Sequence, residues 1–397
     1  MTAPRTPEND TEVISVARTL LAYCRQHDWA GYDPYDALNS KLFAAPAFLN
    51  NRIPRILLTQ ALKRSPINVR PLLRVPKTLN PKAIALFLSA LLRLSTAGVP
   101  DQHDDAGLML QRLAALRSPH TSYWCWGYSF PWQTRTIVVP AWSPNLVCTA
   151  FVAQALFDAH EQRPDAACLA MAVGAAEYIL NELYWADGDF EAGFAYPVPS
   201  ARTQVHNANF LGAAVLTRAY EHTRDERYLF PALRVAHCST AQQHADGGWS
   251  YGEGLSLQWI DNFHTGYNLC ALRQIDRSLK TGEFEATIQR GLDFYTAHFF
   301  REDGAPRYFH DRTYPLDIHS VAQSIITLLA LADLDPAGVL RAHAVFRWAM
   351  KHMWDERGFF YYRRLRCCTI RTSYMRWSQA WMLQAIASLL SETKDAA

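Results

Sequence analysis

Apolar positions recur every three or four residues along most of this 397-residue chain, in twelve stretches separated by polar or aromatic segments. This period predicts α-helices. Only residues 134–140 suggest a short strand, so the pattern predicts an all-α protein. The predicted helices cover residues 13–27, 84–94, 107–117, 147–161, 167–184, 210–222, 228–243, 267–279, 284–300, 321–334, 338–354 and 378–390.

Similar turns follow every second helix in the C-terminal two thirds of the chain. Asp187, Asp246, Asp303 and Asp355 each begin a short turn that contains Gly, and aromatic residues follow each turn. Asp and Gly favour tight turns because both tolerate positive φ angles. The turns are spaced two helices apart, so the repeating unit is predicted to be a helical hairpin.

The loops between helices alternate in length. Short links lie near 161–164, 223–225, 280–282 and 334–336, and long links near 118–144, 186–205, 245–263, 301–318 and 354–373. Helices that run alternately up and down therefore place all long links on one face. A helix at about 11–27 can close a ring beside the last helix at about 374–391, which predicts an (α/α)6 toroid of six inner and six outer helices. The alternative, an open helical solenoid, uses shorter repeats of about 34–47 residues.

Charge is distributed unevenly in what we expect to be a single domain spanning residues 1–397. The net charge is +2, but residues 37–100 carry ten Lys or Arg and no Asp or Glu. Residues 37–80 are also rich in Pro and predict an insertion that wraps one side of the ring. This basic segment, 37–100, fits an anionic membrane surface, a synthase partner or an acidic glycan. Alternatively, the acidic remainder of the chain neutralises it. Nucleic acid is not expected, since aromatic residues are not interleaved with the charges.

The N-terminal segment "MTAPRTPENDTE" is polar and lacks the apolar region of a secretory signal. The eight Cys residues form no CxxC pair, which favours free thiols in a reducing compartment. We therefore expect a cytoplasmic protein, with a position peripheral to the inner membrane left open by the basic segment.

Three predicted helices that follow long loops begin with an apolar residue and then a His. These are His206, His264 and His319, which recur at the step of the repeat. We expect them around one cavity at the N-terminal ends of neighbouring inner helices, where free N–H groups favour anionic or oxygen-rich ligands. Arg376 occupies the same place at the start of the last helix. The alternative is that each His packs or caps at a helix start.

The segment 259–267 holds the best candidates for catalysis. We expect Asp261 to act as acid or base, with His264 and Tyr267 as partners, followed by Asp317 and His319. Glycoside hydrolysis commonly uses two carboxyl groups, whereas lyases and epimerases move a proton at a sugar C–H, where His and Tyr serve well. The alternative for both Asp residues is that they cap the helices that follow them.

Aromatic residues are concentrated in the long loops. Flat rings stack on the apolar faces of sugars, and polar side chains bind the hydroxyl groups. Alternatively, the rings form hydrophobic clusters that close one end of the toroid. The predicted substrate-binding residues are His206, Asn207, Trp132, Trp142, Trp249, Tyr251, Trp259 and Arg376.

Three His residues at one level also suggest zinc. Neighbouring helices lie about 8–10 Å apart, however, and the chain shows no paired-ligand spacing such as HxxxH around these residues. We expect no metal and no other cofactor.

The repeated hairpins with Asp-Gly turns and aromatic loops resemble six-hairpin toroid proteins. Many of those act on carbohydrates, as glycoside hydrolases, polysaccharide lyases, unsaturated glucuronyl hydrolases or sugar epimerases. The segments 126–136 ("WGYSFPWQTRT"), 140–156 and 259–269 are also similar to uncharacterised proteins of bacterial polysaccharide-biosynthesis loci. The resemblance implies a glycan-processing enzyme in bacterial surface or exopolysaccharide metabolism, acting on an oligo- or polysaccharide or a sugar-linked substrate.

Two other classes of function stay open. A non-catalytic module that binds a polysaccharide or a synthase would keep the aromatic residues and dispense with the carboxylates. The "DGGW" element at 246–249 also resembles terpenoid cyclase and prenyltransferase toroids, although the DxDD motif of squalene-type cyclases is missing. Such an enzyme would have an apolar cavity.

Overall fold

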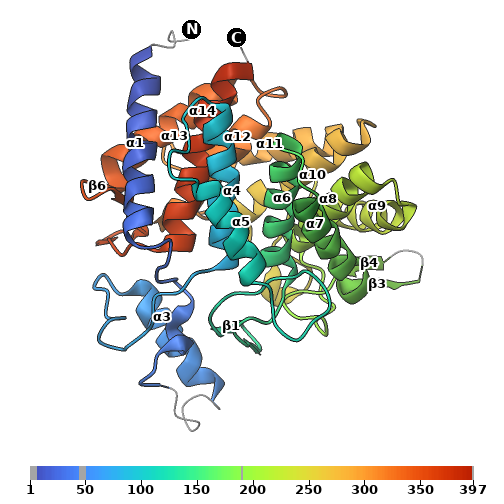
Figure 1. Cartoon of the computed structure of the whole chain (residues 1–397), viewed down its shortest axis with the longest axis horizontal. Helices are drawn as coiled ribbons and strands as arrows, with labels where there is room; N and C mark the ends of the chain where they lie inside the picture. Colours follow the sequence, from blue (N-terminus) through green and yellow to red (C-terminus); the bar gives the residue numbers. More distant parts are fainter. Residues whose placement is uncertain (1–6, 44–50, 189–190, 396–397) are drawn as a thin grey trace.

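Six inner helices form a closed ring in the part of the chain described by the computed structural model, residues 7–43, 51–188 and 191–395. Each inner helix packs against the next, and the last packs against the first (Figure 1). The predicted (α/α)6 toroid is therefore confirmed. The inner helices are α4 (Pro81–Thr96), α6 (Leu146–Gln162), α8 (His206–Thr223), α10 (Asn262–Leu279), α12 (Ile318–Ala330) and the π-helix η4 (Met375–Ala380) continued by α14 (Trp381–Asp395).

A second helix lies outside each inner helix of this described ring. Five outer helices follow their inner partner in a hairpin, and the sixth, α1, packs against α14 as predicted, so that the two ends of the chain meet (Figure 1). The outer helices are α5 (Asp105–Ala115), α7 (Ala166–Tyr178, continued by the π-helix η2, Ile179–Leu183), α9 (Glu226–Thr240), α11 (Glu285–His298), α13 (Ala337–Met353) and α1 (Pro7–Gln26).

The inner and outer helices differ in how they are buried. Every residue of α8 from His206 to Ala219 is buried, because outer helices cover it on one side and the rest of the ring on the other. In α9, by contrast, the buried residues recur every three or four positions, from Tyr228 to Ser239. Only the outer helix is amphipathic in the usual sense.

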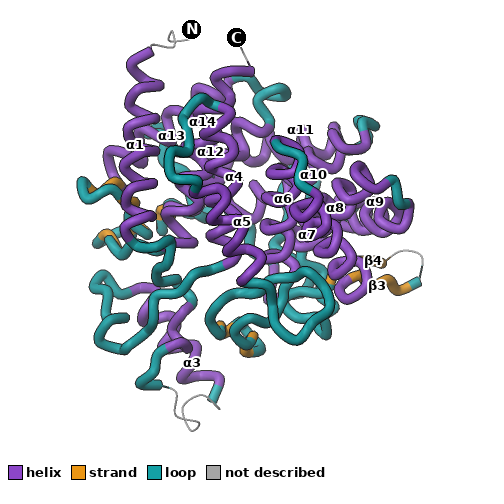
Figure 2. Tube along the Cα trace, in the orientation of Figure 1, coloured by secondary structure: helices purple, strands orange, loops and turns teal. Residues whose placement is uncertain are grey.

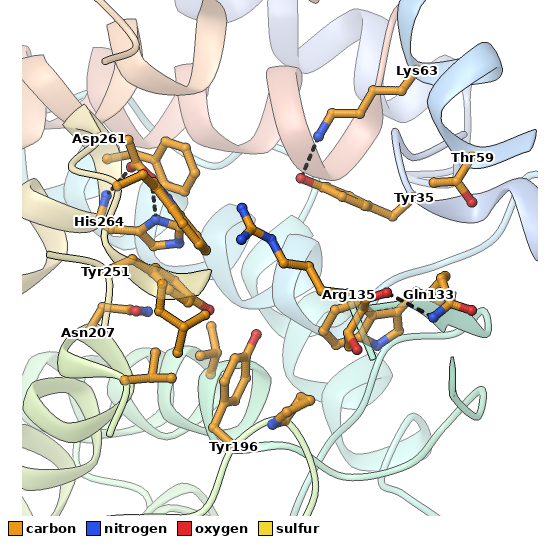
Figure 3. Close-up of a pocket in the computed structure, with 18 of the residues that line it drawn as sticks. Tyr35, Thr59, Lys63, Gln133, Arg135, Tyr196, Asn207, Tyr251, Asp261 and His264 are labelled. Atoms are coloured by element: carbon orange, nitrogen blue, oxygen red, sulfur yellow. Dashed lines mark hydrogen bonds and ion pairs between the residues drawn. The ribbon is translucent and has the colours of Figure 1, made fainter. Parts of the chain in front are cut away.

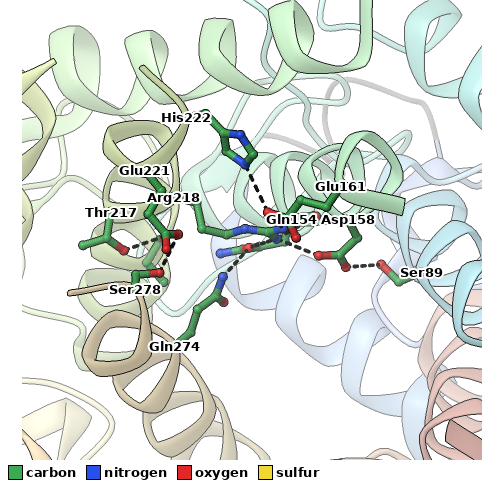
Figure 4. Close-up of polar contacts among 11 residues, drawn as sticks. Ser89, Gln154, Asp158, Glu161, Thr217, Arg218, Glu221, His222, Gln274 and Ser278 are labelled. Atoms are coloured by element: carbon green, nitrogen blue, oxygen red, sulfur yellow. Dashed lines mark hydrogen bonds and ion pairs between the residues drawn. The ribbon is translucent and has the colours of Figure 1, made fainter. Parts of the chain in front are cut away.

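Polar side chains tie four inner helices together towards their C-terminal ends (Figure 4). Arg218 of α8 donates to Gln154 and Asp158 of α6. Ser89 of α4 donates to Asp158, and Gln274 of α10 donates to Gln154. Because buried polar groups are costly unless paired, this network favours one register of the ring.

The Asp-Gly turns have the predicted backbone conformation. The glycines of all four turns, Gly188, Gly247, Gly304 and Gly358, have φ angles between 54° and 93°. The last two residues of the first turn segment, 189–190, lie outside the described residues.

Short strands occur only in the long loops of the described chain (Figure 2). The strand suggested at 134–140 is a hairpin, with β1 and β2 on either side of residues 134–137. Strands β5, β8 and β9 form one small sheet, and the others pair in twos. The strands are β1 (Trp132–Gln133), β2 (Val138–Val139), β3 (Tyr184–Asp187), β4 (Glu191–Phe194), β5 (Leu316–Asp317), β6 (Trp354–Asp355), β7 (Phe359–Phe360), β8 (Arg363–Arg364) and β9 (Thr369–Ile370).

The basic insertion contains a regular helix, α3 (Arg52–Arg64), which the sequence pattern did not predict. Pro54 is compatible with it because Pro is tolerated in the first turn of a helix. Helix α3 lies beside the β1–β2 hairpin at the end of the ring that carries the long loops (Figure 1). Residues 44–50 of the insertion lie outside the described residues.

One described segment, Ala166–Leu183, is long and apolar enough to cross a membrane by length and composition alone. It comprises α7 and η2, and 44% of it is buried inside the molecule, where α7 packs against α6.

Replacing Gly247 by Ala tests the turn geometry. Its φ is 93°, and an added Cβ would lie 2.2 Å from the backbone oxygen of Arg290, so strain and overlap add. We expect Gly247→Ala to lower the free energy of unfolding by about 2–5 kcal/mol in urea titrations. The matched control is Gly188→Ala, where φ is 54° and no atom lies within 4 Å of the added Cβ; its expected cost is about 1 kcal/mol. Equal losses would contradict the explanation.

Candidate active site

The inner helices all begin at one end of the ring and open into one cavity of about 1120 Å³. The residues that precede their first turns are Asn80, Asn145, Val205, Asp261, Asp317 and Tyr374. In every case the second residue after this position lines the cavity. Those six residues are Lys82, Val147, Asn207, Phe263, His319 and Arg376.

Asp261 and His264 form a pair at the start of α10 (Figure 3). Asp261 Oδ1 accepts the backbone N–H of His264 at 3.0 Å, and Oδ2 lies 2.7 Å from His264 Nδ1. Trp259 Nε1 also donates to Oδ2, at 2.9 Å. Because the carboxylate accepts the proton of Nδ1, the lone pair of Nε2 is left free on a residue that lines the cavity.

His319, Tyr267 and Lys82 form a hydrogen-bonded chain from three inner helices. The hydroxyl of Tyr267 lies 2.6 Å from His319 Nε2, and Lys82 Nζ donates to the same hydroxyl at 3.4 Å. The imidazole of His319 is held between the rings of Phe263 and Trp381, at centroid distances of 4.5 and 4.6 Å. Its position is therefore fixed by packing.

Burial shifts the pKa values of the three side chains in this hydrogen-bonded chain. It lowers the pKa of Lys82 well below 10.5, helped by the positive charge of Arg376. It also lowers the pKa of His319 well below 6.5, helped by Lys82 and Arg376, so the imidazole is neutral at pH 7. Burial raises the pKa of Tyr267 well above 10, so its phenol stays protonated. The imidazole and the phenol are therefore uncharged, and both groups, with Lys82, have pKa values shifted in the way that is common at functional sites.

Two arginines on the cavity wall are held from behind by aspartates. Arg376 makes a bidentate pair with Asp33, at 2.6 and 2.8 Å. Arg363 donates to Asp317 at 2.7 Å. Asp317 also accepts Trp377 Nε1 and the backbone N–H of His319, and it is fully buried. Its carboxylate is therefore saturated, and it positions the start of α12.

Aromatic rings line the side of the cavity next to α10. Tyr251 and Trp259 stack at a centroid distance of 4.4 Å, and the guanidinium of Arg135 lies 4.3 Å from the ring centre of Trp259. Trp132 lines the wall as well. Asn207 Oδ1 and Trp132 Nε1 are two of the four polar atoms of lining residues that are buried and have no hydrogen-bond partner in the described chain. They are suited to sugar hydroxyl groups.

Nine of the thirteen predicted site residues line the cavity. They are Asp261, His264, Tyr267, His319, Asn207, Tyr251, Trp259, Trp132 and Arg376.

Four predicted site residues do not line the cavity, which corrects the sequence interpretation for each. His206 is the first residue of its helix, not the second. Its imidazole is hydrogen-bonded to Ser239 of α9 and to Glu253 of the following loop, and it does not line the cavity. Trp249 is buried in the core and donates to Ser239. Trp142 lies outside the lining, and Asp317 lies behind Arg363.

The sequence interpretation missed Lys82, Lys63 and Arg363. Lys82 escaped notice because the predicted helix began at residue 84, although "NPK" at 80–82 carries a signal: Asn80 caps the helix and Pro81 is its first residue. Lys63 comes from a helix that was not predicted. No group of three or more His, Cys, Asp or Glu that could hold a metal ion occurs among the described residues.

Comparison with known proteins identifies the fold. No protein-family model matches the sequence, and no curated protein is similar enough to match. Solved structures do match. A GH76 α-mannanase from Bacteroides thetaiotaomicron has a TM-score of 0.63 and 13% identity, over 81% of this chain and 89% of the mannanase.

An unsaturated glucuronyl hydrolase from Streptococcus agalactiae has a TM-score of 0.63 and 12% identity, over 99% of this chain and 94% of the hydrolase. A cellobiose 2-epimerase from Spirochaeta thermophila has a TM-score of 0.57 and 14% identity, over 79% of this chain and 86% of the epimerase. The chain has the fold of six-hairpin carbohydrate-active enzymes. At these identities the likeness establishes the fold alone, and the reaction has to be argued from the cavity.

Replacing Lys82 by Met tests the protonation described above. The unfolded chain keeps Lys82 protonated up to a pH of about 10.5, whereas burial makes the folded chain lose this proton at a lower pH. The unfolded state therefore holds the extra proton, and stability falls as pH drops below 10.5. We expect Lys82→Met to raise the free energy of unfolding at pH 7 by about 1–4 kcal/mol and to flatten its increase between pH 7 and 10.

Urea unfolding at several pH values measures both effects. The control is Lys77→Met, which removes an exposed lysine and should leave the profile unchanged. Destabilisation at pH 7 with an unchanged pH profile would contradict the assignment.

Proposed function

We propose that the protein is a carbohydrate-active enzyme that removes and returns a proton at a sugar carbon, as an epimerase, isomerase or lyase does. One observation carries the proposal. Asp261 is the single Asp or Glu among the described residues that line the cavity, and its carboxylate is hydrogen-bonded to His264 and Trp259. Glycoside hydrolysis commonly uses two carboxyl groups on either side of the bond, which this wall does not offer.

The proton-handling groups have distinct roles in this proposal. Asp261 holds the Nδ1 proton of His264 and so keeps Nε2 as the base that takes a proton from the carbon next to a carbonyl. The protonated phenol of Tyr267, bonded to neutral His319 of the neighbouring helix, returns a proton to the carbon, and the proton held by His264 then replaces the one lost from the phenol. The amine of Lys82 and the guanidinium of Arg376 stabilise the negative charge that develops on the substrate oxygen.

The alternatives fit the cavity less well. A non-catalytic binding module has no need of a buried His319–Tyr267–Lys82 chain with shifted pKa values. A terpenoid enzyme needs an apolar cavity, and seven Lys or Arg residues line this one. The wider role in bacterial surface polysaccharide metabolism is part of the proposal and rests on the sequence resemblance of residues 126–136 and 259–269.

Replacing Asp261 by Asn tests the role of the pair. Asn presents an N–H donor where Nδ1 and Trp259 both need an acceptor, so the imidazole loses the tautomer that keeps Nε2 free. We expect proton exchange to fall by about 10²–10⁴-fold while sugar binding is retained. The assay incubates the enzyme in D2O with cellobiose, D-mannose or D-glucuronate and follows deuterium at the sugar carbons by NMR.

The matched control is Asp165→Asn, the same change at the residue that caps the outer helix α7. It should keep wild-type exchange. Release of new reducing ends without deuterium at any carbon would identify a hydrolase and overturn the proposal.

A further inference from the structure

The cavity wall is rich in positive charge. Seven Lys or Arg residues line it against Asp261 alone among the described lining residues. Three of the seven have carboxylate partners outside the lining: Arg312 pairs with Asp311, Arg363 with Asp317 and Arg376 with Asp33. The other four have no carboxylate contact in the described chain: Lys63, Arg64, Lys82 and Arg135.

Lys63 is the most informative of these four. It is 9% exposed, and its ammonium donates to the Tyr35 hydroxyl at 2.6 Å and lies 4.1 Å from the centre of that ring. One turn earlier on α3, the hydroxyl of Thr59 also lines the cavity, and it is buried without a hydrogen-bond partner in the described chain. Figure 3 shows both residues on the side of the cavity opposite Asp261 and His264.

This arrangement is costly without a ligand. A buried ammonium loses its hydration, and a phenol hydroxyl offers less compensation than a carboxylate does. Lys63 has three N–H donors, of which Tyr35 accepts one. An anion beside Lys63 and Thr59 would accept the remaining donors and balance the charge.

We propose that Thr59 and Lys63 on α3, with Tyr35, form the subsite for an anionic group carried by the sugar substrate. The basic insertion is then part of the active site, because it supplies the side chains that bind the anionic group of the substrate. This inference rests on the proposed function, since it assigns the substrate class of the same cavity. A carboxylate and a phosphate on the sugar share the required chemistry.

Three probes that differ at carbon 6 test the subsite: D-glucuronate, D-glucose 6-phosphate and D-glucose. Dissociation constants are measured by saturation-transfer NMR at one ionic strength. We expect at least one of the two anionic sugars to bind about 10- to 100-fold more tightly than glucose, and the tighter anion identifies the source of the charge. Lys63→Met should remove this preference and leave glucose binding unchanged, and Lys63→Arg should restore part of it.

The matched control is Arg52→Met, which removes one positive charge from the same helix at an exposed position outside the cavity lining. It should keep the preference. Equal binding of the three sugars to the wild type, or an unchanged preference in Lys63→Met, would overturn the subsite. Binding of none of the three would contradict the carbohydrate function itself and the subsite with it.

The outer surface of the insertion exposes large apolar side chains. Half of the large apolar side chains that are strongly exposed in the described chain fall within residues 42–72. Their exposures are 51% for Leu42, 70% for Ile53, 63% for Leu57, 72% for Ile67 and 76% for Leu72.

Exposed basic residues accompany these side chains. Lys41, Arg52, Arg74 and Lys77 are exposed, and no acidic residue occurs between Asp36 and Asp101. Apolar side chains interspersed with Lys and Arg, free of acidic residues, match the interface of an anionic bilayer, where the former enter the headgroup region and the latter meet the lipid charges. We infer that this surface docks on an anionic membrane leaflet.

Co-sedimentation with vesicles tests the docking surface. We expect binding to phosphatidylcholine vesicles that contain 30% phosphatidylglycerol, with loss at high salt, and no binding to phosphatidylcholine alone. The double variant Ile53→Ser and Leu57→Ser should weaken binding at least about fivefold, whereas Phe230→Ser, which removes a 67% exposed ring from α9, should not. No binding to the anionic vesicles, or equal binding by both variants, would overturn the inference.

Discussion

Ring closure is the constraint on which the site depends. Six inner helices that all begin at the same end must present the same helical position to the centre, and that position is the second residue after each N-terminal cap. Lys82 and Arg376 are almost three hundred positions apart in the chain and still line one cavity. Packing of α14 against α4 brings them together. Each repeat therefore contributes the residue at this position to the cavity wall, and α10 adds His264 and Tyr267 from later positions.

This geometry also decides which polar groups can react. The capping aspartates have their oxygens occupied by backbone N–H groups and neighbouring side chains. They orient the residues that follow them, and the proton transfers that we propose use imidazole, phenol and amine groups. Burial keeps His319 uncharged and lowers the pKa of Lys82, and the stability of the rest of the fold offsets the cost of burying these groups.

The basic insertion completes the cavity. The ring alone provides the wall formed by the inner helices and their long loops, and α3 adds Thr59 and Lys63 on the opposite side (Figure 3). One face of the insertion therefore lines the cavity, while its other exposed side chains are apolar and basic. In the two inferences drawn above, the same segment therefore binds the anionic group of the substrate on one face and the membrane on the other.

The sequence by itself determined the toroid, because helical period, Asp-Gly turns and alternating loop lengths are local properties that can be recognised in each repeat on its own. It also located Asp261, His264 and Tyr267 beside one another, since they share one helix start. Only the tertiary structure decided which residue of each helix start reaches the cavity. A shift of one residue turns a side chain by about 100° on a helix, which is why His206 is turned away while Asn207 lines the wall. No local sequence pattern could predict that Lys63 lines the cavity, because this depends on where α3 packs.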